Sequence, residues 1–117
     1  MTGAPDPDCL FCRVVAGEIP ATIAHRDEDF VAFADINPQA PVHLLLIPTR
    51  HYPNAAALGS TEPGLAGRML EAAGQVAAEA GLDGYRLVFN TGTSAGQSVF
   101  HVHAHVLGGR ALAWPPG

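Results

Sequence analysis

The sequence predicts an α+β protein built on an antiparallel sheet, and three observations lead to this fold class. Residues 42–48 form a continuous apolar run of strand length. Residues 101–106 alternate between histidine and apolar side chains, which is the period of a β-strand. Residues 63–80 place apolar side chains at helical spacing. Strands, one dominant helix and hairpin-like connections together favour an antiparallel sheet.

Length and charge restrict the organisation and the partners of the chain. Its 117 residues are enough for one domain, residues 1–117, which buries roughly 65% of its unfolded surface. The net charge is −5, and Lys and Arg do not cluster. This balance argues against a nucleic-acid partner or an anionic membrane surface, and it agrees with a small-molecule substrate. Apolar runs stay short of the roughly 18 residues of a membrane span and no signal peptide is visible, so we expect a cytoplasmic location.

The N-terminal part of the chain predicts a flexible end followed by a short helix. Residues 1–8 are rich in Pro and Asp and indicate a flexible terminus. Residues 9–17 predict a helix with Asp8 near its N-cap and Gly17 at its end. Cys9 and Cys12 are the two cysteines of the chain. They are either small core residues or half of a zinc site, because Cys-x-x-Cys supplies two of the four ligands that zinc needs.

Three strands follow. Residues 23–26 and 30–35 predict two strands joined by an acidic turn at 27–29. After a loop at Asn37-Pro38, residues 42–48 predict a strand at the centre of the sheet. His43 is the odd residue of this apolar strand. We expect it to lie against the same pocket as the alternating histidines.

The long helix and the last two strands complete the predicted fold. Residues 53–58 predict a helical turn, and Ser60 or Thr61 is expected to cap the long helix, with Pro63 in its first turn. Gly81 is expected to end that helix, residues 85–90 to form a strand, and residues 90–98 to form a small polar loop whose N–H groups can hold an anion. The predicted core stripe of the helix consists of Leu65, Met69, Ala72, Ala73, Val76 and Ala80.

The alternating segment indicates a functional site. On a strand spanning residues 97–107, His101, His103 and His105 would share one face at intervals of about 6.6 Å, and the apolar residues between them would enter a core. Three imidazoles are costly to desolvate, so a purely structural role is disfavoured. Two chemistries remain open. The histidines could ligate zinc or iron with further ligands, or a neutral imidazole could act as a nucleophile.

Residues 101–107 fit the His-φ-His-φ-His-φ-φ signature of the histidine triad superfamily, and the chain resembles this family from Cys9 to Gly117. The flanks, residues 95–98, 108–110 and 114–117, look like its nucleoside phosphoramidase branch. The resemblance implies a five-stranded antiparallel sheet with one long helix and short helices. It also implies a homodimer with a continuous sheet, in which the tail at 108–117, including Trp114, shapes the substrate site of the partner subunit.

The resemblance also implies the chemistry. In the family, the middle histidine, here His103, attacks the α-phosphorus of a nucleotide, and water resolves the nucleotidyl-histidine. The usual substrates are purine nucleoside 5′-phosphoramidates, in which AMP or GMP is joined to an amine, and no metal is required for catalysis. The other residues that match family site positions are His101 and His105 beside the nucleophile, His43 and Asn90 next to the triad, Gly96, Gln97 and Ser98 at the phosphate and leaving group, Asp35 at the ribose, and Phe11 and Ile36 at the base.

The resemblance leaves related activities open and adds a metal. A dinucleoside polyphosphate hydrolase or a nucleotidyl transferase would use the same nucleophile. A further alternative is a nucleotide-binding adaptor, in which catalysis is incidental to binding. Ser98 and the Trp-Pro-Pro-Gly ending favour the phosphoramidase. Some bacterial members hold structural zinc at positions that match Cys9, Cys12, His51 and His101. Four protein ligands leave no open coordination position for chemistry.

Overall fold

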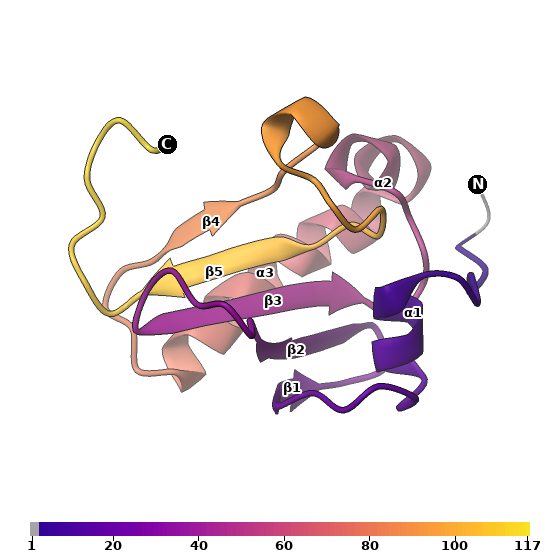
Figure 1. Cartoon of the computed structure of the whole chain (residues 1–117), viewed down its shortest axis with the longest axis horizontal. Helices are drawn as coiled ribbons and strands as arrows, with labels where there is room; N and C mark the ends of the chain where they lie inside the picture. The colour runs from indigo at the N-terminus through magenta and orange to yellow at the C-terminus, as the bar shows by residue number, and fades with distance from the viewer. Residues whose placement is uncertain (1–2) are drawn as a thin grey trace.

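A computed structural model describes residues 3–117, and across them five strands form one antiparallel sheet in the order β1-β2-β3-β5-β4 (Figure 1). The predicted α+β fold class is therefore confirmed. The strands are β1 (Ile23–Arg26), β2 (Phe30–Ala34), β3 (Val42–Pro48), β4 (Arg86–Val88) and β5 (Ala104–Gly108). The helices are α1 (Leu10–Val15), α2 (Ala55–Thr61), α3 (Pro63–Glu79) and a short 3-10 turn, η1 (Thr93–Ala95).

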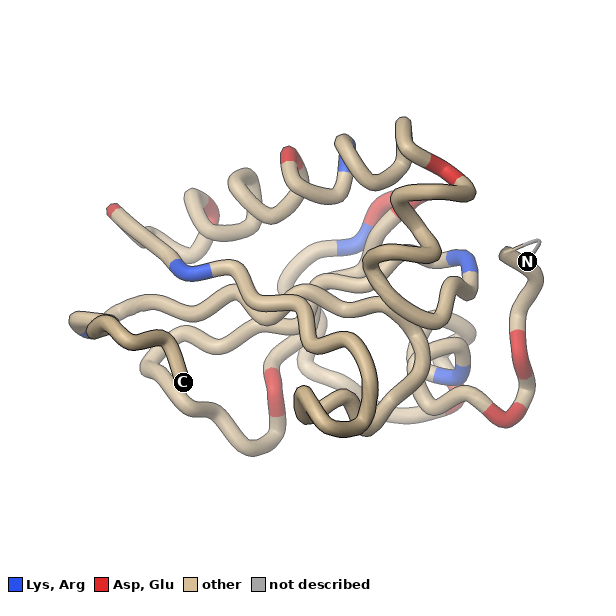
Figure 2. The backbone as a smooth tube through the Cα atoms, turned by 90° about the horizontal axis from the view of Figure 1, so that it is seen from above, with Lys and Arg blue, Asp and Glu red and all other residues tan. Residues whose placement is uncertain are grey.

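The sheet separates two apolar cores, because successive side chains of a strand point to opposite faces. Helix α3 runs along one face, as Figure 2 shows. There Leu46, Ala104 and Val106 pack in the same buried cluster as Leu65 and Met69 of the α2–α3 region. The other face carries a second buried cluster, which contains α1 and the alternate residues of β2 and β3: Cys9, Phe11, Cys12, Val14, Val31, Phe33, Leu45 and Ile47. The site lies on this second face.

Three local expectations about the helices are wrong. Cys9 caps α1 in place of Asp8, and its Sγ accepts a hydrogen bond from the Cys12 N–H at 3.3 Å. Ser60 and Thr61 lie inside α2, and α3 begins at Pro63 without a side-chain cap. The buried stripe of α3 ends at Ala77, whereas Ala80 is exposed beyond the end of the helix. The helix ends at Glu79, so Ala80 is its C-cap and lies past the last turn of the buried stripe, and Gly81 then takes φ +78°.

The predicted strand at residues 97–107 is also wrong in its extent. Strand β5 pairs with β3 only from Ala104 onward, where Ala104 is opposite Leu46. Before that point the chain has left the sheet, and the Val102 N–H donates to the Tyr52 carbonyl at 2.7 Å. The alternation nevertheless persists, because Val102 is buried in the core on the α3 side. Two of the three histidines therefore precede the strand.

The N-terminal segment is described from residue 3 onward. The predicted flexible N-terminus includes Met1 and Thr2, which lie outside the described residues. The Gly3 carbonyl accepts a hydrogen bond from the His51 N–H at 3.1 Å, and the Asp6 N–H donates to Cys12 Sγ at 3.4 Å. The flexibility of this segment stays a prediction. Among the residues that the structure describes, no helix has the length and apolar character needed to cross a bilayer.

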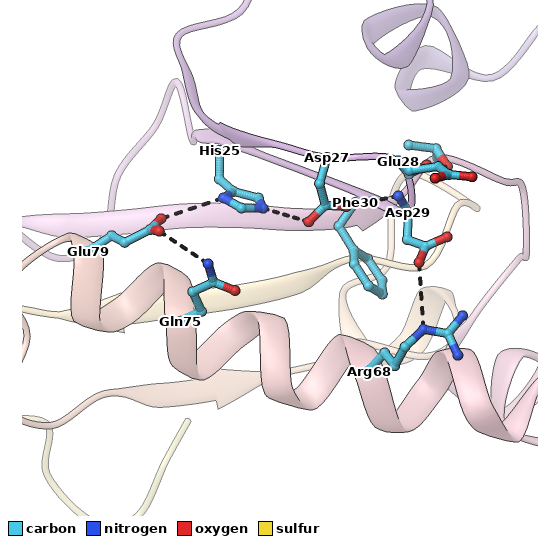
Figure 3. Close-up of polar contacts among 9 residues, drawn as sticks. His25, Asp27, Glu28, Asp29, Phe30, Arg68, Gln75 and Glu79 are labelled. Carbon is cyan, nitrogen blue, oxygen red and sulfur yellow. Dashed lines mark hydrogen bonds and ion pairs between the residues drawn. The ribbon is translucent and has the colours of Figure 1, made fainter.

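A polar cluster closes the β1–β2 turn and joins the sheet to α3 (Figure 3). His25 Nε2 lies 2.7 Å from Asp27 Oδ2, and His25 Nδ1 lies 3.5 Å from Glu79 Oε1. The second oxygen of Asp27 accepts the N–H groups of Asp29 and Phe30, both at 2.8 Å. Burial raises the pKa of Asp27, but the hydrogen bonds from His25, Phe30 and Asp29 outweigh it, and the pKa is lowered below its ordinary value.

Replacing Asp27 with Ala should lower the free energy of unfolding by about 1–2 kcal/mol, because the turn loses its side-chain acceptor. Glu28→Ala, in the same turn, is the matched control and should change it little. A carboxylate with a lowered pKa stabilises the fold above its unfolded pKa and loses this effect as the pH falls through its folded pKa. The difference between wild type and Asp27→Ala should therefore shrink as the pH falls into the acid range. Urea denaturation at pH 7 and pH 3 measures it, and equal losses for both variants would contradict the assignment.

Candidate active site

The three triad histidines lie on the face of the sheet that α1 covers, each in a different environment. His101 is fully buried, His103 is 8% exposed and His105 is partly exposed. The ring of Phe11, from α1, meets the rings of His101 and His103 edge-on, with centroids 6.1 and 5.1 Å away. The His103 and His105 centroids are 5.2 Å apart. The structure therefore brings the triad together under α1.

The main chain fixes the tautomer of His103. Its Nδ1 lies 2.8 Å from the carbonyl oxygen of His101. A carbonyl oxygen can only accept, so Nδ1 must carry the proton. In the neutral ring, Nε2 then holds the free lone pair. This is the atom that a nucleophilic histidine needs.

A second chain of contacts fixes the opposite tautomer of His105. The Gln39 N–H donates to His43 Nδ1 at 3.0 Å, so the proton of a neutral His43 sits on Nε2. That Nε2–H lies 2.9 Å from His105 Nδ1 and 3.3 Å from Asp35 Oδ2. With Nδ1 as acceptor, His105 carries its own proton on Nε2 and can donate it to an anion. Burial, then the nearby charges of His103 and His43, lower the pKa of His105 to about 4, so the ring is neutral near pH 7.

A cleft of about 750 Å³ lies beside α1. Phe11, whose ring meets those of His101 and His103, forms part of its wall, and the triad histidines themselves are outside its lining. Asp35 stands at its rim just after β2, and its Oδ1 accepts the Asn37 N–H at 2.8 Å. Ile36 is fully exposed there. Apolar walls with a carboxylate at one end suit a flat apolar ring attached to a polar group. The cleft is lined among others by Leu10, Phe11, Val14, Phe33, Asp35, Ile36, Ser98 and Val99.

The loop before the triad is held by the side chain of Gln97. This residue is 2% exposed. Its Oε1 accepts the Gly92 N–H at 2.9 Å, and its Nε2 donates to the carbonyls of Pro53 and Val99 at 2.7 and 3.1 Å. The nearby Asn90 amide donates to the Ala95 carbonyl at 2.8 Å. Both side chains thus hold the loop, and any contact of Gln97 with a phosphate would use its backbone.

The tail at 108–117 runs beside the edge strand β4 (Figure 1). Gly109 takes φ +90° and turns the chain out of β5. Arg86 of β4 then donates to the carbonyls of Leu112 and Ala113, at 3.3 and 2.8 Å. Trp114 is 83% exposed. The structure therefore places the tail at the edge of the sheet, whereas Phe11, Asp35, Ile36 and Ser98 line the cleft.

Cys9, Cys12, His51 and His101 converge on one point, and we call them the Cys2His2 cluster. His101 Nδ1 lies 3.4 and 3.5 Å from the Sγ atoms of Cys9 and Cys12, and 3.2 Å from His51 Nδ1. Cys12 Sγ lies 3.4 Å from His51 Nδ1. Tetrahedral zinc with ordinary bond lengths separates two nitrogens by about 3.3 Å and nitrogen from sulfur by about 3.5 Å.

The protonation of the Cys2His2 cluster also suits a metal. The Nε2–H of His101 donates to the Pro48 carbonyl at 2.9 Å, which leaves Nδ1 with the lone pair that faces the cysteines. Burial lowers the pKa of His101 to about 4 and raises that of Cys12 to about 11. A bound cation is what converts such buried thiols to thiolates. A structural zinc ion therefore fits these residues.

A second group, Asp35, His43 and His105, also has donor atoms within 4.8 Å of one another. It does not suit a metal in the same way. The Gln39 N–H occupies Nδ1 of His43, so the nitrogen that faces the group carries the proton. The donor atoms are similarly close together in both groups. The proton positions favour metal binding by the Cys2His2 cluster and hydrogen bonding within the group of Asp35, His43 and His105.

Sequence reasoning named the residues of both clusters and missed the main-chain groups that set their protons. Pro48, whose carbonyl holds His101, gave no signal beyond its place at the end of an apolar run. Gln39 lies in the Asn37-Pro38 loop, four residues before His43, and that spacing is a usable signal for a local side-chain to backbone contact.

Fold and site together define an α+β domain that gathers three histidines under α1, next to Phe11 and an apolar cleft. The HIT domain family matches residues 16–112, and the chain belongs to this family. It is 48% identical over 111 residues to an uncharacterised HIT-like protein of Synechocystis sp., covering 94% of this chain and 97% of that one. A HIT family hydrolase from Legionella pneumophila shares 46% identity with a TM-score of 0.90, covering 94% and 100% of the two chains. A zinc-bound histidine triad family protein from Mycobacterium smegmatis shares 34% identity with a TM-score of 0.77, covering 88% and 76%.

Gln97→Glu tests the role of the buried amide with almost no change of shape. The carboxylate would face two carbonyl oxygens that now accept hydrogen bonds, so we expect a loss of about 2–4 kcal/mol in the free energy of unfolding. Gln39→Glu makes the same change at an exposed position and is the control. Chemical denaturation at pH 7 measures both, and equal stability of the two variants would refute the role.

Protein purified without added metal should contain one zinc ion per chain. Cys9→Ser and His51→Ala should each remove most of it, because each leaves three ligands. His25→Ala removes a histidine outside the Cys2His2 cluster and should leave the zinc content unchanged. Elemental analysis gives the measurement, and a trace amount of metal that Cys9→Ser does not alter would end the assignment.

Proposed function

We propose that this protein is a nucleotide-binding hydrolase that cleaves the P–N bond of purine nucleoside 5′-phosphoramidates through a nucleotidyl-histidine intermediate. The observation that carries the proposal is the hydrogen bond from His103 Nδ1–H to the His101 carbonyl, which leaves Nε2 unprotonated at a nearly buried position. The Legionella relative is itself described as a HIT family hydrolase, which supports the reaction class.

In the first step, the lone pair of His103 Nε2 attacks the α-phosphorus, and the P–N bond to the amine breaks. The amine leaves with its electron pair and takes up a proton. The new imidazolium keeps its Nδ1–H on the His101 carbonyl, which stabilises the positive charge. His105, with its proton on Nε2, donates to a phosphoryl oxygen as charge develops there.

In the second step, water attacks the phosphorus of the intermediate, the P–Nε2 bond breaks, and the nucleoside monophosphate leaves. The proton that water releases balances the proton that the amine took up in the first step. Two displacements replace one difficult displacement. Ser98 at the cleft provides a hydroxyl beside the leaving group. No step requires a metal, and zinc in the Cys2His2 cluster would serve the structure.

The cleft supports a nucleoside as the substrate. The rings of Phe11 and Phe33 lie 5.5 Å apart at 75° and, with exposed Ile36, form apolar walls for a purine. Asp35 at the rim has an oxygen that can accept hydrogen bonds from both hydroxyls of a ribose. A diadenosine polyphosphate hydrolase would use the same groups. The cytoplasmic location inferred from the sequence stays a prediction.

His103→Ala should abolish the nucleotidyl-enzyme intermediate and reduce turnover by about 10³-fold or more, because the attacking atom is lost. Nucleotide binding should persist, since Asp35 and the loop at 92–98 remain. His105→Ala should be milder, because it removes a donor and not the bond-forming atom. Acid-quench trapping of labelled nucleotide from a phosphoramidate, a diadenosine and a nucleotide-sugar substrate gives the measurement. Full turnover by His103→Ala would exclude the mechanism.

We also propose that two copies form a homodimer with a continuous sheet and that the tail shapes the site of the partner subunit. β4 is an edge strand, and the tail that carries the exposed Trp114 runs beside it. Deleting residues 111–117 should leave a dimer in sedimentation experiments but change the preference among amine leaving groups. A monomeric wild type, or an unaltered selectivity profile after the deletion, would contradict this proposal.

A further inference from the structure

We propose that the Cys2His2 cluster positions the nucleophile: a metal held there fixes His101, and His101 in turn fixes the proton and the orientation of His103. The inference rests on the proposed function for its catalytic meaning, but its structural part can be tested without a substrate. It makes Cys9, Cys12 and His51 positioning residues for a reaction that they do not touch.

The first connection passes through the main chain of His101. Its side chain faces the cluster through Nδ1, 3.4 and 3.5 Å from the two sulfurs. Its carbonyl oxygen, a few bonds away, accepts the Nδ1–H of His103 at 2.8 Å. A metal bound to the ring would restrict movement of the His101 Cα, and therefore also of the carbonyl attached to it. The same residue therefore serves the metal on one side and the nucleophile on the other.

The second connection passes through α1. Phe11 lies between the two cysteines in sequence, and its ring meets the ring of His103 edge-on at 5.1 Å and 88°. Cys9 is the N-cap of this six-residue helix, and Cys12 lies in its first turns. Holding both sulfurs in one coordination sphere therefore also fixes the aromatic wall beside the nucleophile. Both connections end at the same ring.

A bound metal would hold together ligands that lie on different parts of the chain. The residues of the Cys2His2 cluster come from three separate segments: the start of α1, the turn after β3 and the approach to β5. Two thiolates and two neutral imidazoles around a divalent cation carry no net charge, so the metal adds little field at His103. The effect that we infer is one of position, and it predicts a change of tautomer and not of charge.

The direct test is ¹⁵N NMR of the histidine side chains in zinc-loaded and chelator-treated full-length protein. We expect His103 to be entirely the Nδ1–H tautomer when zinc is bound and a mixture of both tautomers when it is removed. Cys9→Ser should behave like the metal-free protein. His25→Ala removes a histidine that contacts Asp27 and Glu79, outside the Cys2His2 cluster, and its His103 should match the wild type. An Nδ1–H tautomer that is unchanged in folded, metal-free protein would overturn the inference.

A second test does not require the metal-free protein to stay folded. It relies on the fact that coupling between two sites is reciprocal. If the metal fixes His103, then His103→Ala should weaken zinc binding by at least about fivefold in competition with a chromophoric chelator. His25→Ala is the matched control. Its contacts are with Asp27 and Glu79, outside the Cys2His2 cluster and the triad, so its zinc affinity should equal that of the wild type. Equal affinities in all three proteins would overturn the inference.

The two proposals fail in different ways. If zinc-loaded wild type turns over no nucleotide substrate, the proposed function fails, whereas the tautomer and affinity measurements still decide the coupling. If turnover proceeds through His103 and neither the tautomer nor the zinc affinity responds as expected, the proposed function stands and the coupling is wrong.

Discussion

The site depends on one constraint: three of its imidazoles, those of His43, His101 and His103, each have one nitrogen committed to a main-chain group. The His101 carbonyl binds Nδ1–H of His103, the Pro48 carbonyl binds Nε2–H of His101, and the Gln39 N–H binds Nδ1 of His43. A main-chain carbonyl can only accept and an amide N–H can only donate, so each contact decides where the proton of a neutral ring lies. The chemistry of the remaining nitrogens follows from these three contacts.

The strand register and helix α1 bring these main-chain groups to the histidines. Strand β3 presents His43 opposite Leu107 and next to His105, because its antiparallel register with β5 sets Leu45 against His105. The end of β3 brings the Pro48 carbonyl to the buried His101. Helix α1 then covers this face and excludes water from His101, which is fully buried. A small shift of register would separate the histidines from the backbone groups that orient them.

The sequence predicted the parts of this arrangement that depend on periodicity. Alternation placed the three histidines on one side of the chain, and the apolar run placed β3 within its observed bounds. The resemblance to a family brought Cys9, Cys12, His51 and His101 together, and the structure places them in one cluster. The contact of Pro48 could not be predicted, because a backbone carbonyl of any residue type can make it, whereas the four-residue spacing of Gln39 and His43 was a usable signal that was missed. The buried amide of Gln97 was missed for a related reason: its partners at Gly92, Pro53 and Val99 are all main-chain atoms.

The proposed reaction through Nε2 of His103 is tested most directly by the position of the bond in the trapped intermediate. Protein with ¹⁵N-labelled histidine, quenched during turnover of a nucleoside phosphoramidate, can be examined by ³¹P–¹⁵N NMR. We expect a single phosphorus–nitrogen bond to Nε2 of His103, with the proton still on Nδ1. Phosphorus bound to Nδ1 of His103, to His105 or to the hydroxyl of Ser98 would contradict it.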